Sequence, residues 1–344
     1  MPERTPVERR TPRRVRMLAF GILVAASAAL AAGYVTKAAL DTRASTDAAE
    51  TTARISAPVR AEGAYVAFRS LDRKHAATYG RVALARFAKS GATRTLTGLN
   101  CDRMHFGGGR GLCLTRRGRL FTYRARIVGR DFRSSRDVSL NGIPSRARVS
   151  PDGRYGAATT FVSGHSYAVA GAFSTATVLI DMKRGTKLGN LEEFGVSRDG
   201  RRFRKRDFNF WGVTFARDSN RFYATLASGK KTYLIEGNVR TRTARILREN
   251  VECPSLSPDN TRLAYKKLVA GPGGWRFHVL DLGTMSDTPL AEDRHIDDQV
   301  EWLDNRRILY RTGEDVWTVR ADGNGSPQKF LNAADSPAVV RAAG

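Results

Sequence analysis

Short apolar runs alternate with turn signals from about residue 64 to the end of this 344-residue chain. The runs are four to nine residues long and rich in Val, Tyr, Phe, Leu and Ile, as in LFTYRARIV, TYLIEGNV and RFHVLDL. No run of ten or more residues after position 60 shows the 3.6-residue periodicity of a helix. Regularly spaced short strands of this kind predict an all-β sandwich, barrel or propeller.

One hairpin pattern recurs along the chain and favours the propeller. Its copies are RVSPDGRYGAATT, TFARDSNRFYATL, SLSPDNTRLAYKK and EWLDNRRILYRT, with a looser copy, GVSRDGRRFRK. The aspartates of the four clear copies are Asp152, Asp218, Asp259 and Asp304, and the last two gaps, of 41 and 45 residues, match one four-stranded blade. We expect Asp259 to form its turn, with its side chain bonded to nearby backbone, and to have no catalytic role.

The repeats predict a six-bladed β-propeller of four-stranded blades, with seven blades as the alternative count. The segment SPAVVR near the C-terminus would supply a strand that closes the ring against the first blade. Radial closure leaves few exposed sheet edges. The predicted domains are a basic cytoplasmic segment, a membrane anchor or signal peptide, a linker and the propeller, at residues 1–16, 17–35, 36–60 and 61–341.

The N-terminus carries the clearest local signal. Six arginines precede an uncharged run of 19 residues at 17–35, just long enough to span a bilayer as a helix. Arginines before the span place the N-terminus in the cytoplasm, so we expect a single-pass plasma-membrane protein with an extracytoplasmic C-terminal domain. The alternative is a cleaved signal peptide, because Ala29-Leu30-Ala31 has the A-x-A form of a cleavage site, and the protein would then be secreted.

Charge and cysteine content refine this picture. The formal net charge is +25, which attracts anionic polymers or lipid headgroups, although arginines spread along the chain also serve solubility alone. The predicted location argues against nucleic acid as a partner.

Outside the membrane, Cys101 and Cys113 are candidates for a disulfide, since glycines between them let the chain turn back, and Cys253 is left as a buried thiol.

The Ser-Pro-Asp-Gly hairpins resemble the WD40-like (PD40) repeats of the TolB propeller and of propellers fused to prolyl-oligopeptidase-type peptidases. The resemblance is closest to TolB-like translocation proteins of actinobacteria, carried by FVSGHSYA, NFWGVTFA, NVECPSLSPD and DDQVEWLD over residues 60–341. It implies a propeller that works with a partner in the cell envelope. The N-terminal domain of TolB is missing here, so a role in translocation does not follow, and fold does not determine function.

No segment carries a convincing catalytic motif. GHSYA approximates a G-x-S-x-G nucleophile elbow around Ser166, but Ala168 replaces the second glycine and a strand follows where a helix is needed. The carboxylates of EDRHIDDQVEW lack the regular spacing of a calcium loop. We therefore predict no catalytic residue, cofactor or metal. The basic run RDGRRFRKRD is expected to be an exposed insertion, with docking of an anionic polymer as the alternative.

The loops that lead into successive inner strands converge on one face of a propeller, and this is where we expect contacts with a partner. The candidate residues are His165, Ser166, Tyr167, Asn209, Trp211, Glu252, Asp298 and Gln299. For Trp211 and Trp302 the alternative is packing between blades.

Three functions are compatible with these features. The favoured one is a non-enzymatic, membrane-anchored, extracytoplasmic propeller that binds a protein or an anionic envelope polymer. The second is a propeller enzyme, a lyase or hydrolase acting on a sugar or lactone at the channel mouth. The third is an extracytoplasmic sensor or regulatory subunit. Converging histidines and carboxylates around one channel would favour the enzyme.

The predicted anchor can be tested on the protein isolated from its own cells. If residues 17–35 stay as a membrane span, N-terminal sequencing should find a chain that begins near Met1 and fractionates with the membrane. A mature N-terminus near residue 32 would instead identify a cleaved signal peptide.

Overall fold

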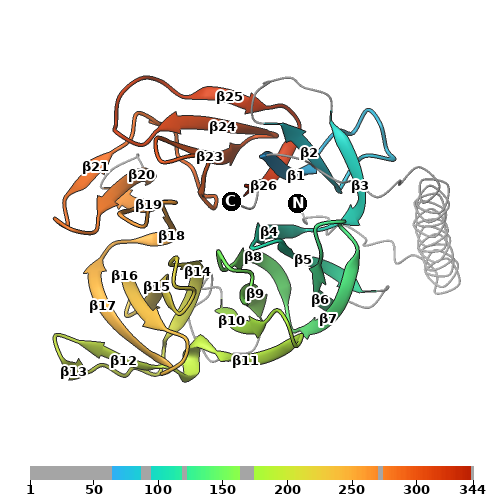
Figure 1. The fold of residues 1–344 in the computed structure, drawn as a ribbon. Helices are drawn as coiled ribbons and strands as arrows, with labels where there is room; N and C mark the ends of the chain where they lie inside the picture. Colours follow the sequence, from blue (N-terminus) through green and yellow to red (C-terminus); the bar gives the residue numbers. More distant parts are fainter. Residues whose placement is uncertain (1–63, 87–93, 118–121, 163–173, 270–273, 342–344) are drawn as a thin grey trace, which may run out of the picture. The chain divides into compact units, whose positions relative to one another are not determined.

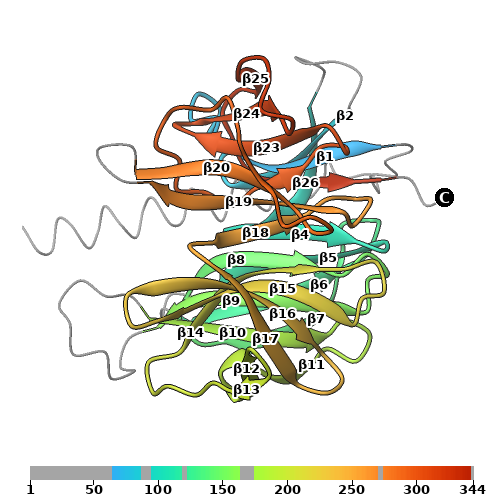
Figure 2. The ribbon, with the colours of Figure 1, turned by 90° about the vertical axis from the view of Figure 1, so that its left-hand side faces the viewer.

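The propeller is seen directly in a computed structural model of the chain, which describes residues 64–86, 94–117, 122–162, 174–269 and 274–341. Six sheets surround a central axis (Figure 1), each with an antiparallel four-stranded core, and Figure 2 shows the same ring from the side. The predicted all-β fold with six four-stranded blades is confirmed. No helix in the described ranges is long and apolar enough to cross a bilayer, and the predicted anchor at 17–35 lies outside those ranges.

The strands follow one another blade by blade, from the axis outward. The first blade contains β26 (Ala334–Val340), β1 (Tyr65–Ser70), β2 (Arg81–Arg86) and β3 (Thr95–Asn100). The second contains β4 (Arg103–Gly107), β5 (Arg110–Arg117), β6 (Thr122–Val128) and β7 (Ser134–Leu140). The third contains β8 (Ile143–Val149), β9 (Tyr155–Val162), β10 (Ser174–Asp181) and β11 (Thr186–Asn190), and a short 3-10 helix, η1 (Leu191–Glu193), follows it.

The other three blades repeat this order. The fourth contains β14 (Asn209–Phe215), β15 (Arg221–Ser228), β16 (Lys231–Asn238) and β17 (Thr243–Glu249). The fifth contains β18 (Glu252–Leu256), β19 (Arg262–Val269), β20 (Gly274–Asp281) and β21 (Asp287–Pro289). The sixth contains β22 (Glu301–Trp302), β23 (Arg307–Thr312), β24 (Asp315–Arg320) and β25 (Gln328–Leu331).

The core lies between the blades. Six clusters of buried apolar side chains are found among the described residues, one at each contact between neighbouring blades. Inner strands are covered on both faces, and every residue of β14 is buried, whereas the outer strand β7 is mostly exposed. A strand that is buried on both faces is expected to be apolar along its whole length, so a polar residue within it is a candidate for a specific role.

The ring is closed by the two ends of the described chain. β26 pairs antiparallel with β1, with Val66 opposite Val339 and Ala67 opposite Ala338. The predicted closing strand is thereby confirmed. It supplies the innermost strand of the first blade, so the sheet that begins the propeller is completed by residues that end it.

The repeated aspartates form the turns of the inner hairpins, as the sequence predicts. Asp152 Oδ1 accepts the Arg154 amide at 2.8 Å, and Asp259 Oδ1 accepts the Thr261 amide at 3.1 Å. Asp218 and Asp304 make equivalent bonds in their own turns. These are Asx turns, in which the carboxylate replaces a backbone acceptor. The pKa of Asp259 is about 2, because the hydroxyl and amide donors of Ser257 and Thr261 outweigh the effect of burial.

The basic run forms an addition to the fourth blade. β12 (Gly195–Arg198) pairs parallel with β17, and β13 (Arg201–Arg202) folds back against it. Phe203 anchors the segment by stacking on Phe208 with ring centroids 5.5 Å apart. The arginines of β13 are exposed, in agreement with the expected insertion.

Cys101 and Cys113 form the predicted disulfide, with Cα atoms 5.4 Å apart. Cys101 follows the outer strand of the first blade, and Cys113 lies in β5 of the second, so the bond joins two blades covalently. Cys253 is a free and buried thiol, also as predicted.

Removing the disulfide should destabilise the propeller. In the Cys101→Ala/Cys113→Ala variant we expect the free energy of unfolding to fall by about 2–3 kcal/mol, because the unfolded chain loses a short closed loop. Urea denaturation with and without reductant measures this. Reductant should lower the stability of the wild type and leave the double variant unchanged, and an equal response of both proteins would contradict the prediction.

Candidate functional site

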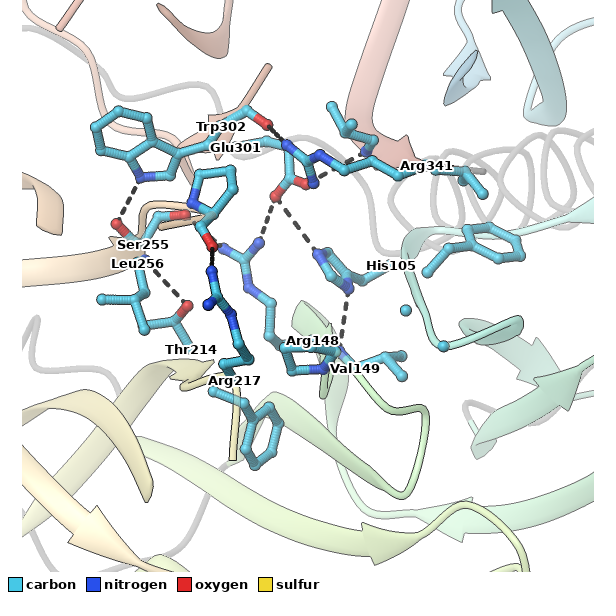
Figure 3. Close-up of a pocket in the computed structure, with 18 of the residues that line it drawn as sticks. His105, Arg148, Val149, Thr214, Arg217, Ser255, Leu256, Glu301, Trp302 and Arg341 are labelled. Carbon is cyan, nitrogen blue, oxygen red and sulfur yellow. Dashed lines mark hydrogen bonds and ion pairs between the residues drawn. The ribbon is translucent and has the colours of Figure 1, made fainter. Parts of the chain in front are cut away.

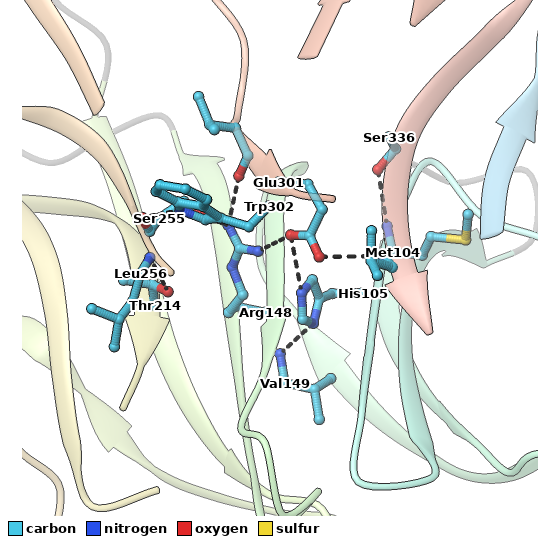
Figure 4. A network of polar contacts seen from close by, with 12 residues as sticks. Met104, His105, Arg148, Val149, Thr214, Ser255, Leu256, Glu301, Trp302 and Ser336 are labelled. Carbon is cyan, nitrogen blue, oxygen red and sulfur yellow. Dashed lines mark hydrogen bonds and ion pairs between the residues drawn. The ribbon is translucent and has the colours of Figure 1, made fainter. Parts of the chain in front are cut away.

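A buried ion pair crosses the axis of the propeller. Arg148 lies on β8 and Glu301 lies on β22, 153 residues apart in sequence. The Nη1 group of Arg148 donates a hydrogen bond to Oε2 of Glu301. Both side chains are less than 10% exposed. Figure 4 shows them pointing toward each other from opposite sides of the ring. Burial would raise the pKa of Glu301, but the neighbouring His105 and Arg148 outweigh it and lower that pKa to about 2. Glu301 is therefore ionised.

His105, from β4, completes the network, and its hydrogen bonds define which ring nitrogen carries the proton. Its Nδ1 accepts the backbone N–H of Val149 at 3.0 Å, so the ring proton of the neutral imidazole lies on Nε2. Nε2 in turn lies 3.4 Å from Oε2 of Glu301. The pKa of His105 is lowered, because burial and the charge of Arg148 outweigh the opposing effect of the Glu301 carboxylate. The imidazole is therefore neutral, and the network contains one cation and one anion.

All six inner strands contact this network. Arg148 donates to the Val213 carbonyl of β14 at 3.4 Å and to Ser255 Oγ of β18 at 3.4 Å. Glu301 Oε1 accepts the Val339 amide of β26 at 3.2 Å. Together with His105 on β4, every blade contributes at least one group. The network is thus a polar hub for the ring.

A cavity of about 700 Å³ opens on one side of the hub (Figure 3). It lies at the end of the axis where the inner strands finish and the repeated hairpins turn, here called the hairpin mouth. Its floor contains His105, Arg148, Ser255 and Glu301. Its walls include the aromatic or aliphatic side chains Tyr65, Phe106, Phe215, Leu256, Trp302 and Val339. A cavity of this size is large enough for a small ligand or a peptide segment.

The rim of the cavity is cationic. Arg130, Arg217 and Arg341 line it and are exposed, and the only carboxylate in its described lining is Glu301. Arg217 Nη2 donates to the Pro258 carbonyl at 3.0 Å, and Arg341 Nη2 donates to the Trp302 carbonyl at 3.1 Å. These bonds orient the guanidinium groups without neutralising them.

The predicted contact residues that the structure describes lie at the other end of the axis, where the inner strands begin, here called the opposite mouth. Asp298 and Gln299 line a small recess there, together with Glu301, so the hub lies between recess and cavity. Asp298 accepts the Arg311 amide at 3.1 Å. Asn209 is buried, and its Oδ1 accepts the Thr175 amide of the preceding blade at 2.9 Å.

The remaining predicted residues at this mouth are also largely covered. Trp211 is buried, which agrees with the alternative of packing between blades. Glu252 lies 3.6 Å from the ammonium of Lys266, a fully buried lysine that also pairs with Asp297. Burial raises the pKa of Glu252. A role of these residues in binding a partner stays a prediction.

The contacts predicted for the GHSYA segment stay a prediction. His165, Ser166 and Tyr167 lie outside the described residues. No cluster of three or more histidine, cysteine or carboxylate side chains suited to a metal ion occurs within the described ranges.

Sequence reasoning missed the hub and the larger cavity, although a signal for the hub exists. Arg148, Thr214 and Ser255 each stand four residues before the turn aspartate of their own repeat, and Glu301 stands three residues before its own. Aligning the four repeats on that aspartate places one polar residue of each near the same point of its inner strand. Arg148, Ser255 and Glu301 belong to the hub, whereas Thr214 Oγ1 accepts the Leu256 amide. A polar residue at that position is expensive to bury unless it is bonded, so its recurrence indicates that polar partners lie close by.

Comparisons with known proteins identify the fold. No protein-family model matches the chain, and no curated protein sequence is similar to it. The crystal structure of TolB from Acinetobacter baumannii matches with a TM-score of 0.54 and 13% identity, covering 80% of this chain and 66% of that one. A chain of a nidogen/laminin complex matches with a TM-score of 0.55 and 11% identity, covering 80% of this chain and 98% of that one.

These matches confirm the predicted resemblance to TolB at the level of fold. The chain spans slightly less than two thirds of the length of the Acinetobacter protein. At such low identity the likeness extends to the propeller and no further.

Breaking the hub should be costly for stability. In Glu301→Ala, Arg148 would remain buried without its counter-charge, so we expect the free energy of unfolding to fall by about 3–5 kcal/mol. The Arg148→Met/Glu301→Leu variant, which removes both charges, should be clearly more stable than Glu301→Ala in urea denaturation. Equal stability of the two variants would show that the ion pair is unimportant.

The same pair predicts an acid sensitivity. The pKa of Glu301 falls from 4.5 to about 2 on folding, so its contribution to stability is complete above about pH 4.5 and is lost as the pH falls toward about 2. Urea midpoints measured between about pH 6 and pH 3 should therefore fall more steeply for the wild type than for Glu301→Gln. Parallel curves for the two proteins would contradict this.

Proposed function

We propose that this chain is a membrane-anchored, extracytoplasmic propeller that binds a partner protein through its channel mouth and catalyses no reaction. The anchor is supported by the uncharged run at residues 17–35 and the arginines before it. An anionic envelope polymer is the alternative partner.

The observation that carries the proposal is the chemistry of the cavity at the hairpin mouth. Among its described lining residues, the single imidazole and the single carboxylate are His105 and Glu301, and both are held in the hub. General acid–base catalysis needs a titratable group that reaches a substrate with a suitable pKa. A cavity of about 700 Å³ whose acid–base groups already serve each other is better suited to binding.

The structural comparisons are compatible with this proposal. One similar structure is a complex of nidogen with laminin, and TolB has the same fold. Propellers host many functions, so these likenesses add support only to the general idea of a binding propeller.

Site-specific cross-linking in intact cells tests the proposal on the full-length protein. A photo-reactive residue at Pro258 places the probe at the cavity rim, and the contact Pro258 makes there uses its carbonyl, which the substitution retains. The matched control carries the probe at Leu188, which is exposed on the outer strand β11. We expect a discrete protein adduct from position 258 that is missing from position 188.

Other outcomes separate the alternatives. A protease-resistant smear from position 258 would identify a polymer as the partner. Identical adducts from both positions, or none from position 258, would contradict binding through this mouth.

A further inference from the structure

The cavity at the hairpin mouth carries an excess of positive charge. Its described lining contains four guanidinium groups, from Arg130, Arg148, Arg217 and Arg341, and one carboxylate, from Glu301. Glu301 is paired with Arg148, which leaves three positive charges without an ion pair among the described residues. Charges that line a concave site with apolar walls act more strongly than they would on an open surface.

The turn aspartates lie at the same mouth, and three of them form an ion pair with an arginine of their own hairpin. Asp152, Asp218, Asp259 and Asp304 all direct a carboxylate oxygen to amide groups of their own turns. None of the four belongs to the cavity lining. The repeat therefore supplies carboxylates to the turns and leaves the rim to arginine.

The rim arginines are held in position by neutral groups. Arg217 donates a hydrogen bond to the carbonyl oxygen of Pro258, and Arg341 donates one to that of Trp302. Arg130 packs over Gly109. A Cβ atom on residue 109 would lie 2.5 Å from Nε of Arg130. Gly109 has a φ of +75°, a conformation that favours glycine, so the loop leaves the space that Arg130 occupies.

The walls between these charges are apolar and aromatic. Pro151, Leu256 and Val340 line the cavity beside the arginines and are at least partly exposed. A simple inorganic anion would use the charges and leave these apolar side chains exposed to water. A peptide that alternates carboxylate and apolar side chains would use both, with each carboxylate able to bind a guanidinium through two hydrogen bonds.

We propose that the hairpin mouth binds an acidic peptide segment of the partner, with its carboxylates on Arg130, Arg217 and Arg341 and its apolar side chains against Pro151, Leu256 and Val340. This inference rests on the proposed function, since it names the chemistry of the partner at the same cavity.

Fluorescence anisotropy with the full-length protein tests the proposal. The probe is a fluorescein-labelled peptide of alternating Glu and Leu, compared with the same peptide carrying Gln for every Glu. The cavity variant is Arg130→Gln/Arg217→Gln/Arg341→Gln. The matched control is Arg201→Gln/Arg202→Gln/Arg204→Gln, which removes the same charge from exposed arginines of the blade-four addition.

We expect the Glu peptide to bind the wild type at least about tenfold more tightly than the Gln peptide, because loss of one good charge pair alone costs about that factor. The cavity variant should lose at least about tenfold in affinity, and the control variant less than about twofold. Thermal unfolding should show that all three proteins are folded, with a somewhat lower midpoint for the cavity variant, because Arg341 helps to lower the pKa of Glu301 in the hub.

Three results would overturn the proposal. Equal losses in the cavity and control variants would show a non-specific attraction of a basic chain for anions. Equal binding of the Glu and Gln peptides would show that charge is irrelevant. Arginine-dependent binding of inorganic phosphate, without binding of the Glu peptide, would make the cavity a small-anion site.

Failure of this inference is distinguishable from failure of the proposed function. If cross-linking from position 258 yields the same partner adduct in the cavity variant as in the wild type, partner binding stands and its acidic chemistry is wrong. If the peptide binds through the three arginines but no adduct forms in cells, the cavity chemistry stands and the proposed function is wrong.

Discussion

The ring of this propeller depends on one buried ion pair, between Arg148 and Glu301. Five of the blades are built from strands that are close in sequence, the first combines β26 with β1–β3, and apolar contacts join each blade only to its two neighbours. The ion pair and its hydrogen bonds are the contacts described here that reach across the axis and include a group from every inner strand. Desolvating two charges is expensive, so such a pair adds less net stability than its attraction suggests, but an unpaired member would be strongly destabilising. The pair therefore favours the one arrangement of six blades in which both charges are satisfied.

The hub also determines which charged groups of the channel remain available to a ligand. It uses the only imidazole and the only carboxylate of the described cavity lining, and it leaves the rim arginines facing the space above. The repeated aspartates lie outside the cavity lining, and three of them pair with arginines of their own hairpins. The carboxylates that shape the hairpins therefore do not pair with the arginines that line the cavity.

Two further contacts complete the ring at its seam. β26 joins β1 in one sheet, and the disulfide of Cys101 and Cys113 joins that blade to the next. Both reinforce the region where the chain begins and ends its circuit. A ring closed in this way holds the hairpin loops in fixed relative positions, so the cavity they form is suited to recognising a ligand with little rearrangement.

The sequence by itself indicated the all-β class, the closing strand and six blades, with seven as the alternative count, and it made Cys101 and Cys113 candidates for a disulfide, because each is encoded in a local pattern or in the recurring hairpin. The turn role of Asp259 was determined for the same reason. The tertiary structure decided that Arg148 meets Glu301, that His105 is neutral between them, and that the larger cavity opens at the hairpin mouth. The predicted contacts Asn209, Glu252 and Asp298 were placed at the opposite mouth. Residues far apart in sequence meet at the axis only after the ring closes, and the pattern of one strand does not show which partner stands across it.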